Sequence, residues 1–260
     1  MMSDNYEWFK QSFLSLSGID LNSYKEGQMK RRIDNFLRKS KASGYQEFIK
    51  TIKSDKELYD SFVTYLTINV SEFYRNPLQW RTLEQEIIPL LLERFGKPLK
   101  IWSAACSTGD EPYSLAMVLS DFVPLSQIQI LATDMDQEVL AKAKEGCYTE
   151  QSIKGLPKRY RDKFLHVDSD GKVKVSEQLK SCITFKKHDL LKDTYPREMH
   201  MIVCRNVMIY FTEEAKDKIY HRFSASLSRQ GILFVGSTEQ IIGAGQYNFQ
   251  GIQSFFYEKQ

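Results

Sequence analysis

A chain of 260 residues with a formal net charge of +3 is long enough for one large domain or two modest ones, and its composition is that of an ordinary soluble protein. It has no run of about 18 apolar residues, which excludes a predicted membrane span, and its first residues lack the features of a secretory signal. The four cysteines are far apart, so neither a disulfide framework nor a structural zinc site is expected. We therefore expect a cytoplasmic protein with reduced thiols.

The first part of the chain has the apolar spacing of helices. Apolar residues recur at intervals of three and four in four segments. These segments predict helices over residues 6–17, 24–41, 45–53 and 57–70. Gly44 stands where a helix stop is expected. The pattern predicts an all-α N-terminal domain over residues 1–75.

The second predicted helix carries a basic cluster. Seven lysines and arginines but only two acidic residues lie within residues 25–41. At about 100° per residue, Arg31 and Arg38 point away from the apolar face and into solvent. Such a surface attracts an anionic partner, although a plain solvated charged face remains the alternative.

The later part of the chain alternates strands with helices, which indicates a parallel, doubly wound sheet of the α/β class. Strands are predicted over residues 99–103, 128–133, 183–187, 199–204, 232–235 and 255–257. Helices are predicted over residues 83–95, 112–122, 136–145 and 212–228. One polar segment interrupts the alternation, and its Asp170-Gly171 pair between alternating runs predicts a hairpin. We expect a small antiparallel insertion within residues 147–184.

The link between the first strand and its helix, residues 104–114, is a candidate ligand loop. Its small residues let a ligand approach the backbone, and the helix N-terminus offers N–H groups to a carboxylate or phosphate. Gly109 is its only glycine, so the loop is not the G-x-G-x-x-G of dinucleotide sites. On pattern alone, a plain turn from strand to helix explains the loop equally well.

An acidic residue ends the second predicted strand. Asp134 lies roughly 20 residues past the loop, where an acid typically accepts hydrogen bonds from ribose hydroxyls. Asp136 is the better candidate for the N-cap of the next helix. A ribose-binding acid fits S-adenosylmethionine (SAM) and NAD equally, so Asp134 alone does not choose between them.

Four stretches of the chain closely resemble the CheR chemoreceptor methyltransferases, and they occur in the same order. They are residues 69–76 (NVSEFYRN), 102–114 (WSAACSTGDEPYS), 132–136 (ATDMD) and 204–211 (CRNVMIYF). The resemblance implies an N-terminal helical domain, a linker helix over residues 76–96, and a class I (Rossmann-like) SAM-dependent methyltransferase domain over residues 97–260 with a small β-subdomain. It also implies transfer of the SAM methyl group to glutamate carboxylates of chemotaxis receptors for sensory adaptation, giving methyl esters and S-adenosylhomocysteine (SAH).

The resemblance further implies a cofactor site between two domains. Glu111 would hold the methionyl ammonium, Asp134 the ribose hydroxyls, and Met135 would line the adenine pocket. Relatives often carry asparagine at the position of Asp189, near the adenine rim. The full set of implied cofactor contacts is Asn69, Ser71, Arg75, Glu111, Asp134, Met135, Asp189, Leu190, Asn206 and Val207.

Methylation of a glutamate requires little acid–base chemistry. The carboxylate, with a reference pKa of about 4.3, is already ionised near neutral pH, so positioning is the main demand. Arg75 can orient it through two parallel N–H bonds, and Tyr210 can donate a third. A surface cation and a core aromatic, respectively, are the plainer interpretations of these two residues. The four histidines fit no metal or triad spacing, and no metal is expected.

The resemblance favours Arg31 and Arg38 as a docking surface for the cytoplasmic methylation helices of membrane receptors. We expect the protein to be a monomer that is not embedded in the membrane. No nucleic-acid partner is expected. Amino-group methylases of bases carry Asn/Asp-Pro-Pro-Tyr/Phe where residues 205–208 read RNVM, and Cys204 lacks the preceding proline of base-carbon methylases. A SAM-binding module without activity, or a methyltransferase acting on another protein or RNA, remains the alternative.

Overall fold

The computed structural model describes residues 6–67, 69 and 71–260. The chain forms two compact units, each with its own hydrophobic core. The helical unit comprises Met1–Ile68 with Tyr210–Asp217, and the sheet unit comprises Asn69–Ile209 with Lys218–Gln260. The first division therefore lies before Asn69 rather than after residue 75. The reason is that Phe73 and Tyr74 pack into the core of the sheet unit.

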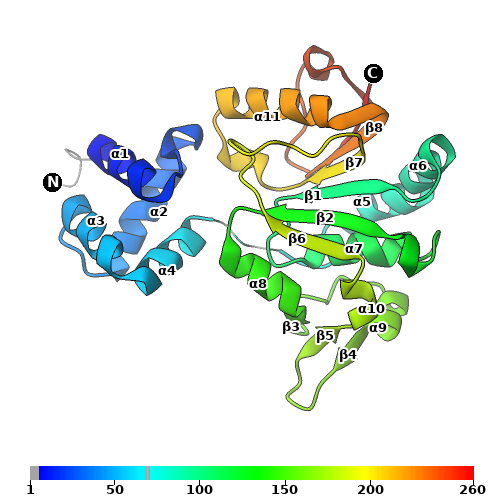
Figure 1. Ribbon diagram of the computed structural model, residues 1–260, viewed down its shortest axis with the longest axis horizontal. Coiled ribbons are helices and arrows are strands. Elements are labelled where there is room, and N and C mark those ends of the chain that lie inside the picture. The colour runs from blue at the N-terminus through cyan, green and yellow to red at the C-terminus, as the bar shows by residue number, and fades with distance from the viewer. Residues whose placement is uncertain (1–5, 68, 70) are drawn as a thin grey trace. The chain divides into compact units, whose positions relative to one another are not determined.

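The helical unit contains the four helices expected from the sequence (Figure 1). Its elements are α1 (Tyr6–Ser17), η1 (Leu21–Ser23), α2 (Glu26–Lys39), α3 (Tyr45–Ser54) and α4 (Lys56–Leu66). Helix α4 ends at Leu66, short of the predicted end, and residues 68 and 70 of that prediction lie outside the described residues. Aromatic rings fill the core; Phe48 and Phe62 meet edge-on, with ring centroids 4.8 Å apart.

Residues 210–217 belong to the helical unit although they follow a strand of the sheet unit. Lys25 N donates to Tyr210 O at 2.9 Å, and Thr212 N donates to Ser23 O at 2.9 Å. Between these two hydrogen bonds, Tyr24 forms an isolated antiparallel bridge with Phe211. This short backbone pairing ties the segment to the start of α2.

The sheet unit is built on seven strands in the order β6-β2-β1-β7-β8-β10-β9 (Figure 1). The parallel strands are β1 (Lys100–Ala104), β2 (Gln129–Asp134), β6 (Ile183–Lys187), β7 (Met199–Cys204) and β8 (Leu227–Val235). The antiparallel strands are β9 (Phe249–Gln253) and β10 (Phe256–Lys259). Ala104 pairs with Thr133, and Ser103 pairs with Val203. The carboxyl ends of β1, β2 and β7 therefore meet at one edge of the sheet.

A long helical segment precedes β1. It consists of α5 (Pro77–Thr82), the π-helical turn η2 (Leu83–Ile87) and α6 (Ile88–Phe95). It lies within the linker helix over residues 76–96 that the resemblance implied, and it begins six residues before the helix that the apolar spacing predicted over residues 83–95. The remaining helices of the main fold are α7 (Asp110–Leu119), η3 (Leu125–Gln127), α8 (Gln137–Glu145), η4 (Met208–Tyr210), α11 (Glu213–Ser226) and η5 (Ala244–Tyr247). Helices α7 and α8 pack against β2 and β6.

The expected antiparallel insertion is present as a second, three-stranded sheet in the order β3-β5-β4. Its elements are β3 (Cys147–Tyr148), α9 (Lys158–Phe164), β4 (Leu165–Val167), β5 (Val173–Val175) and α10 (Glu177–Lys180). Asp168 closes the predicted turn: its N–H donates to Lys172 O at 2.9 Å, and Gly171 has a φ of +74°. Helices α9 and α10 were not predicted.

Among the described helices, none combines the length and the apolar character needed to cross a bilayer. All four cysteines are present as thiols.

Candidate active site

The loop after β1 has an unusual backbone. Ala105, Ser107 and Gly109 have φ values of +82°, +48° and +91°, and such conformations cost non-glycine residues on the order of 1–3 kcal/mol each. Thr133 O holds the loop by accepting from the N–H groups of Ala105 and Cys106, each at 2.8 Å. Backbone strain of this kind is often found where a loop holds a ligand.

Gly109 is required in this loop for two reasons. Its positive φ favours glycine. A Cβ atom there would also lie 2.9 Å from Ala143 Cβ, closer than real Cβ contacts come, and 3.0 Å from the Tyr148 hydroxyl, which is a tight contact. The single glycine of the predicted ligand loop thus allows α7 to start close to its neighbours.

Glu111 lies in the first turn of α7 and carries a nearly buried carboxylate. Its Oε1 accepts from Ser103 Oγ at 2.8 Å, and its Oε2 is 3.5 Å from Arg205 Nη1. Burial raises the pKa of Glu111, and the attraction of the Arg205 guanidinium opposes that rise. A carboxylate in this setting can bind a second cation, such as a ligand ammonium group.

Asp134 ends β2 with its carboxylate beside the loop. Oδ2 accepts from Ser107 N at 2.9 Å, and Oδ1 accepts from Asp136 N at 3.0 Å. Burial raises the pKa of Asp134 to about 6. A carboxylate has about four acceptor positions, so two N–H bonds leave capacity for ligand hydroxyls.

Asp136 is the N-cap of α8, as predicted, and its Oδ1 accepts from Glu138 N at 2.9 Å. Asn69 Nδ2 donates to its other oxygen at 3.1 Å. Ser71 makes a side-chain hydrogen bond with Asp110, and Thr108 Oγ1 donates to Asp110 Oδ2 at 2.6 Å. Asn69 and Ser71 are therefore attached to the loops that follow β2 and β1.

Arg205, directly after β7, is a buried cation for which the sequence predicted no role. Its Nη2 donates to Arg75 O at 2.9 Å and to Gln79 Oε1 at 2.7 Å, and its guanidinium lies 4.7 Å from the centre of the Phe234 ring. Burial lowers the pKa of Arg205, and Glu111 opposes that shift. An arginine directly after a run of buried strand residues was the signal that could have identified it.

Glu239 is a second buried charge that the sequence analysis missed. Its Oε2 accepts from Asn206 N at 2.6 Å and Gly236 N at 2.8 Å, and its Oε1 accepts from Met208 N at 2.7 Å. These bonds hold Asn206 at a φ of +59°. Nothing in the local sequence pattern around Glu239 indicates the contacts with Asn206 and Met208, because these two partners follow a different strand.

The other predicted cofactor residues lie on the same carboxyl edge. Met135 follows β2 and Val207 follows β7, and both are partly buried. Asp189 follows β6 and accepts from Leu191 N at 2.8 Å, while Leu190 O accepts from Tyr195 Oη at 2.8 Å. Four strands therefore bring the predicted residues of the sheet unit to one edge.

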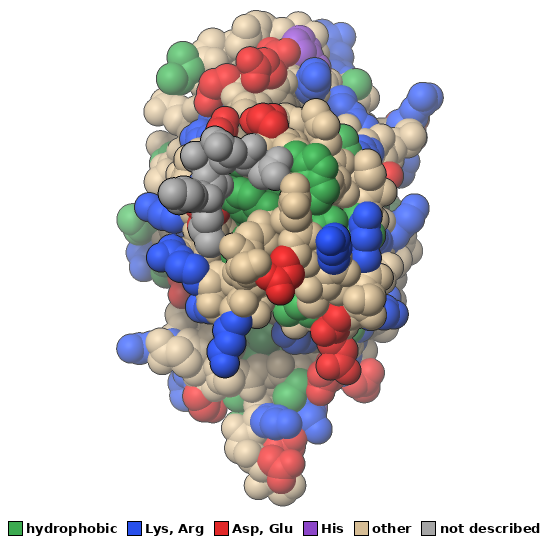
Figure 2. All heavy atoms as spheres, turned by 90° about the vertical axis from the view of Figure 1, so that its left-hand side faces the viewer, with side chains coloured by type: hydrophobic (Ala, Val, Ile, Leu, Met, Phe, Trp, Pro, Cys, Tyr) green, Lys and Arg blue, Asp and Glu red, His purple; other side chains and the backbone are tan. Residues whose placement is uncertain are grey.

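The remaining predicted residues are divided between the units. Arg75 belongs to the sheet unit, where its carbonyl oxygen also accepts from Trp80 Nε1 at 2.8 Å. Tyr210, Arg31 and Arg38 belong to the helical unit. Figure 2 faces the helical unit and shows Lys and Arg side chains on its surface beside acidic ones.

Comparison with known proteins identifies the chain. Residues 4–67 match the family described as CheR methyltransferase, all-alpha domain, and residues 69–255 match CheR methyltransferase, SAM binding domain. The chain belongs to the CheR methyltransferase family. Such proteins carry out SAM-dependent methylation in chemotaxis, and the parallel sheet with its α-helical N-terminal part is the fold expected for one.

Relatives of this CheR protein match over nearly its whole length. A chemotaxis protein methyltransferase of Listeria monocytogenes is 41% identical over 99% of this chain and 98% of its own. One from Borreliella burgdorferi is 32% identical, covering 93% of this chain and 89% of its own. Chemotaxis protein methyltransferase 1 of Pseudomonas aeruginosa is 31% identical over 91% of this chain and 90% of its own.

The sheet unit of this CheR protein has polar groups that fit SAM. Ser107 Oγ, Arg205 Nε and Gln79 Nε2 are buried and lack a hydrogen-bond partner in the described part of the chain. The nearby carboxylates of Glu111 and Asp134 suit an ammonium group and ribose hydroxyls. Within residues 6–67, 69 and 71–260, no three His, Cys, Asp or Glu side chains group as potential metal ligands.

Proposed function

We propose that this protein methylates the side-chain carboxylates of glutamates on chemotaxis receptors, giving glutamyl methyl esters. The observation that carries the proposal is the buried bridge through Arg205. This guanidinium bonds Arg75 O and faces Glu111. Arg205 thereby connects Arg75 with Glu111. Arg75 is a cation suited to orient an acceptor carboxylate, and Glu111 is an acid suited to hold the methyl donor.

In this proposal the cofactor contacts keep the roles expected from the sequence. Glu111 binds the ammonium group, and Asp134 accepts hydrogen bonds from the ribose hydroxyls. Bound SAM supplies a methyl group on a positively charged sulfur, and SAH is left after transfer. The other proposed contacts are Asn69, Ser71, Arg75, Met135, Asp189, Leu190, Asn206 and Val207.

The acceptor glutamate needs orientation rather than deprotonation. Its carboxylate is ionised near neutral pH, because the reference pKa is about 4.3. Arg75 donates two N–H bonds to it and Tyr210 one O–H bond, so that one oxygen is directed at the methyl carbon. No proton moves in this step; a C–O bond forms as the C–S bond breaks, and sulfur keeps the electron pair.

The receptor contact proposed for the helical unit is the exposed face of α2. Met29, Ile33 and Leu37 are buried on one side of this helix, while Arg31 and Arg38 are exposed on the other. Acidic helices of a receptor would meet these cations. The Arg38 guanidinium already bonds Asn35 Oδ1, which restrains its side chain at the surface.

The test is incubation of the protein with methyl-labelled SAM and membranes that carry a chemotaxis receptor, with cellular RNA as a second acceptor. The proposal predicts label on the receptor that mild base releases as methanol, which is the behaviour of a carboxyl ester. Base-stable label on protein, or label on RNA, would assign a different acceptor and overturn the proposal.

A further inference from the structure

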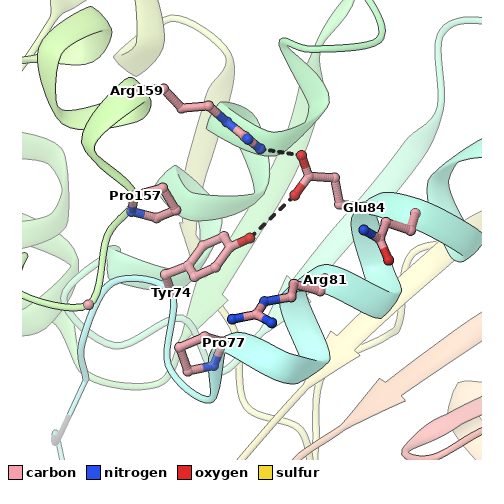
Figure 3. Close-up of a pocket in the computed structure, with 8 residues that line it drawn as sticks. Tyr74, Pro77, Arg81, Glu84, Pro157 and Arg159 are labelled. Atoms are coloured by element: carbon pink, nitrogen blue, oxygen red, sulfur yellow. Dashed lines mark hydrogen bonds and ion pairs between the residues drawn. The ribbon is translucent and has the colours of Figure 1, made fainter.

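The sheet unit has a pocket between the start of the linker helix and the loop that leads into α9 (Figure 3). Its volume is about 440 Å³, within the ~300–1,000 Å³ range of ligand pockets. Its main lining residues are Tyr74, Pro77, Arg81, Glu84, Pro157 and Arg159. None of these is among the cofactor contacts proposed above.

One wall of this pocket is a hydrogen-bonded chain around Glu84. Its carboxylate accepts from the Arg159 guanidinium and from the Tyr74 hydroxyl, the latter at 3.4 Å. Burial and Glu84 raise the pKa of Tyr74 to about 12, so the hydroxyl remains a donor. Arg159 also contacts Tyr160 Oη at 2.9 Å and Asp121 Oδ2 at 3.4 Å, and all these contacts use Nη2. Its Nε and Nη1 make no hydrogen bond within the described residues.

The helix that carries Glu84 also carries a cation that no acid neutralises. Figure 3 shows the Arg81 side chain reaching toward Tyr74 and Pro77, and across the described ranges no acidic side chain pairs with it. Two guanidinium groups against the single carboxylate of Glu84 leave the pocket with a formal charge of +1. Guanidinium donors match a carboxylate in geometry as well as in charge.

An apolar side chain lies on the same helix face as Arg81. Leu78 precedes it by three residues, which places the two side chains together on α5. Leu78 is 73% exposed, a high value for a leucine. A cation beside an exposed leucine favours a polypeptide ligand with acidic and apolar side chains. A small free anion could pair with the cation but would make no apolar contact with the leucine.

We propose that this pocket takes a second acidic side chain of the polypeptide substrate, next to the glutamate that is methylated. Arg81 and Arg159 receive its carboxylate, and Leu78 packs against a neighbouring apolar side chain. This inference rests on the proposed function, from which it takes the acidic substrate. Chain continuity supports it, because Tyr74 of the pocket directly precedes Arg75, the residue proposed to orient the acceptor.

The two positions are also joined by packing. The Tyr74 ring stacks on Trp80, with ring centroids 5.1 Å apart, and Trp80 Nε1 donates to Arg75 O at 2.8 Å. The same aromatic pair therefore contacts Tyr74 of the pocket and holds the backbone of Arg75. Substrates with two acids at a suitable spacing would be selected.

The test compares methylation kinetics of Arg81→Glu with those of Arg229→Glu, using receptor-bearing membranes as substrate. Arg229 is an exposed arginine of β8 outside both sites, and its reversal controls for net charge. We expect Arg81→Glu to raise the receptor KM roughly tenfold, with SAH affinity equal to wild type. Leu78→Ser should raise KM in the same direction.

The variant Glu84→Gln should change the receptor KM in the opposite direction. It removes the one carboxylate of the pocket and keeps the hydrogen-bonding shape, so we expect KM to fall by up to about threefold. Equal kinetics for Arg81→Glu and Arg229→Glu, with an active wild type, would overturn the pocket alone. Absence of receptor methylation by the wild type would overturn the proposed function, and the pocket assignment with it.

Discussion

At the residue scale, the site depends on a few buried charges that are held by backbone groups. Asp134 accepts two backbone N–H bonds, Glu239 accepts three, and Arg205 donates to the carbonyl of Arg75. Unpaired, each would cost several kcal/mol. These contacts fix the ends of β1, β2, β7 and β8 before any ligand binds, which is what catalysis by positioning requires.

The raised pKa of Asp134 leads to a pH-dependence of cofactor binding. Above about pH 6 the carboxylate is ionised and accepts strongly from ribose hydroxyls. Below that pH it takes up a proton, so SAH affinity should fall by up to about tenfold per pH unit. Calorimetric titration with SAH from about pH 7.5 to about pH 5, which spans the pKa of Asp134, measures this. The Asp134→Asn variant should bind SAH weakly at every pH, and its SAH affinity should depend less on pH. An equally steep pH-dependence in that variant would contradict the proposal that Asp134 binds the ribose.

Replacement of Arg75 separates catalysis from cofactor binding. Arg75→Ala removes the side chain proposed to orient the acceptor but keeps the carbonyl oxygen that Arg205 and Trp80 bond. We expect kcat to fall by about a hundredfold, while SAH affinity changes far less. Steady-state rates and SAH titration of the same preparation give both values. Equal losses in the two would make Arg75 mainly a cofactor ligand.

At the element scale, the strand ends and the loops that follow them make the site. The sequence predicted β1, β2 and β7 because short, mostly buried runs form them. It also predicted β6, although only Ile183 of that strand is buried. It did not predict β9, whose residues are mostly exposed and include Gly251, so that no apolar alternation marks it. The roles of Arg205 and Glu239 were also missed, because each depends on contacts with residues remote in the chain that no local period encodes.

The loop after β1 should tolerate no side chain at Gly109. In Gly109→Ala, the added Cβ meets Ala143 and Tyr148, and the φ of +91° is unfavourable for alanine. We expect the free energy of unfolding to fall by about 1–3 kcal/mol, with weaker SAH binding. Urea denaturation followed by circular dichroism measures the loss.

The matched control for the loop is Gly245→Ala. A Cβ at Gly245 would meet nothing within 4 Å, so this variant should unfold within about 0.5 kcal/mol of wild type. A Gly109→Ala protein as stable as the control would show that the loop is not held as tightly as its contacts indicate.

Helix α2 offers a separate test of the receptor surface. The double variant Arg31→Glu, Arg38→Glu should raise the receptor KM by about tenfold or more, and the effect should shrink as salt is added. SAH affinity should be unchanged. The control is Lys50→Glu with Lys53→Glu on α3, which makes the same charge change at other exposed positions. Equal receptor kinetics for the two double variants would exclude α2 as the docking face.

At the scale of the whole molecule, the proposed cofactor contacts and the proposed docking face of α2 lie in different units. The sheet unit contains all the proposed cofactor contacts, including Asn69, Ser71 and Arg75. The sequence placed these three with the N-terminal helices because no strand signal separates them from α4. The helical unit contains Tyr210 together with the basic face of α2. We therefore expect substitutions on α2 to change receptor recognition without changing cofactor binding.

The most direct test of glutamate methylation is to locate the modified atom. A purified receptor is incubated with SAM and the wild-type protein, digested, and sequenced by tandem mass spectrometry. The proposed function predicts that fragments containing particular glutamates gain the mass of one methylene group and lose it after mild alkali. A methyl group found on lysine, arginine or a backbone nitrogen, or a receptor left unmodified by active protein, would contradict it.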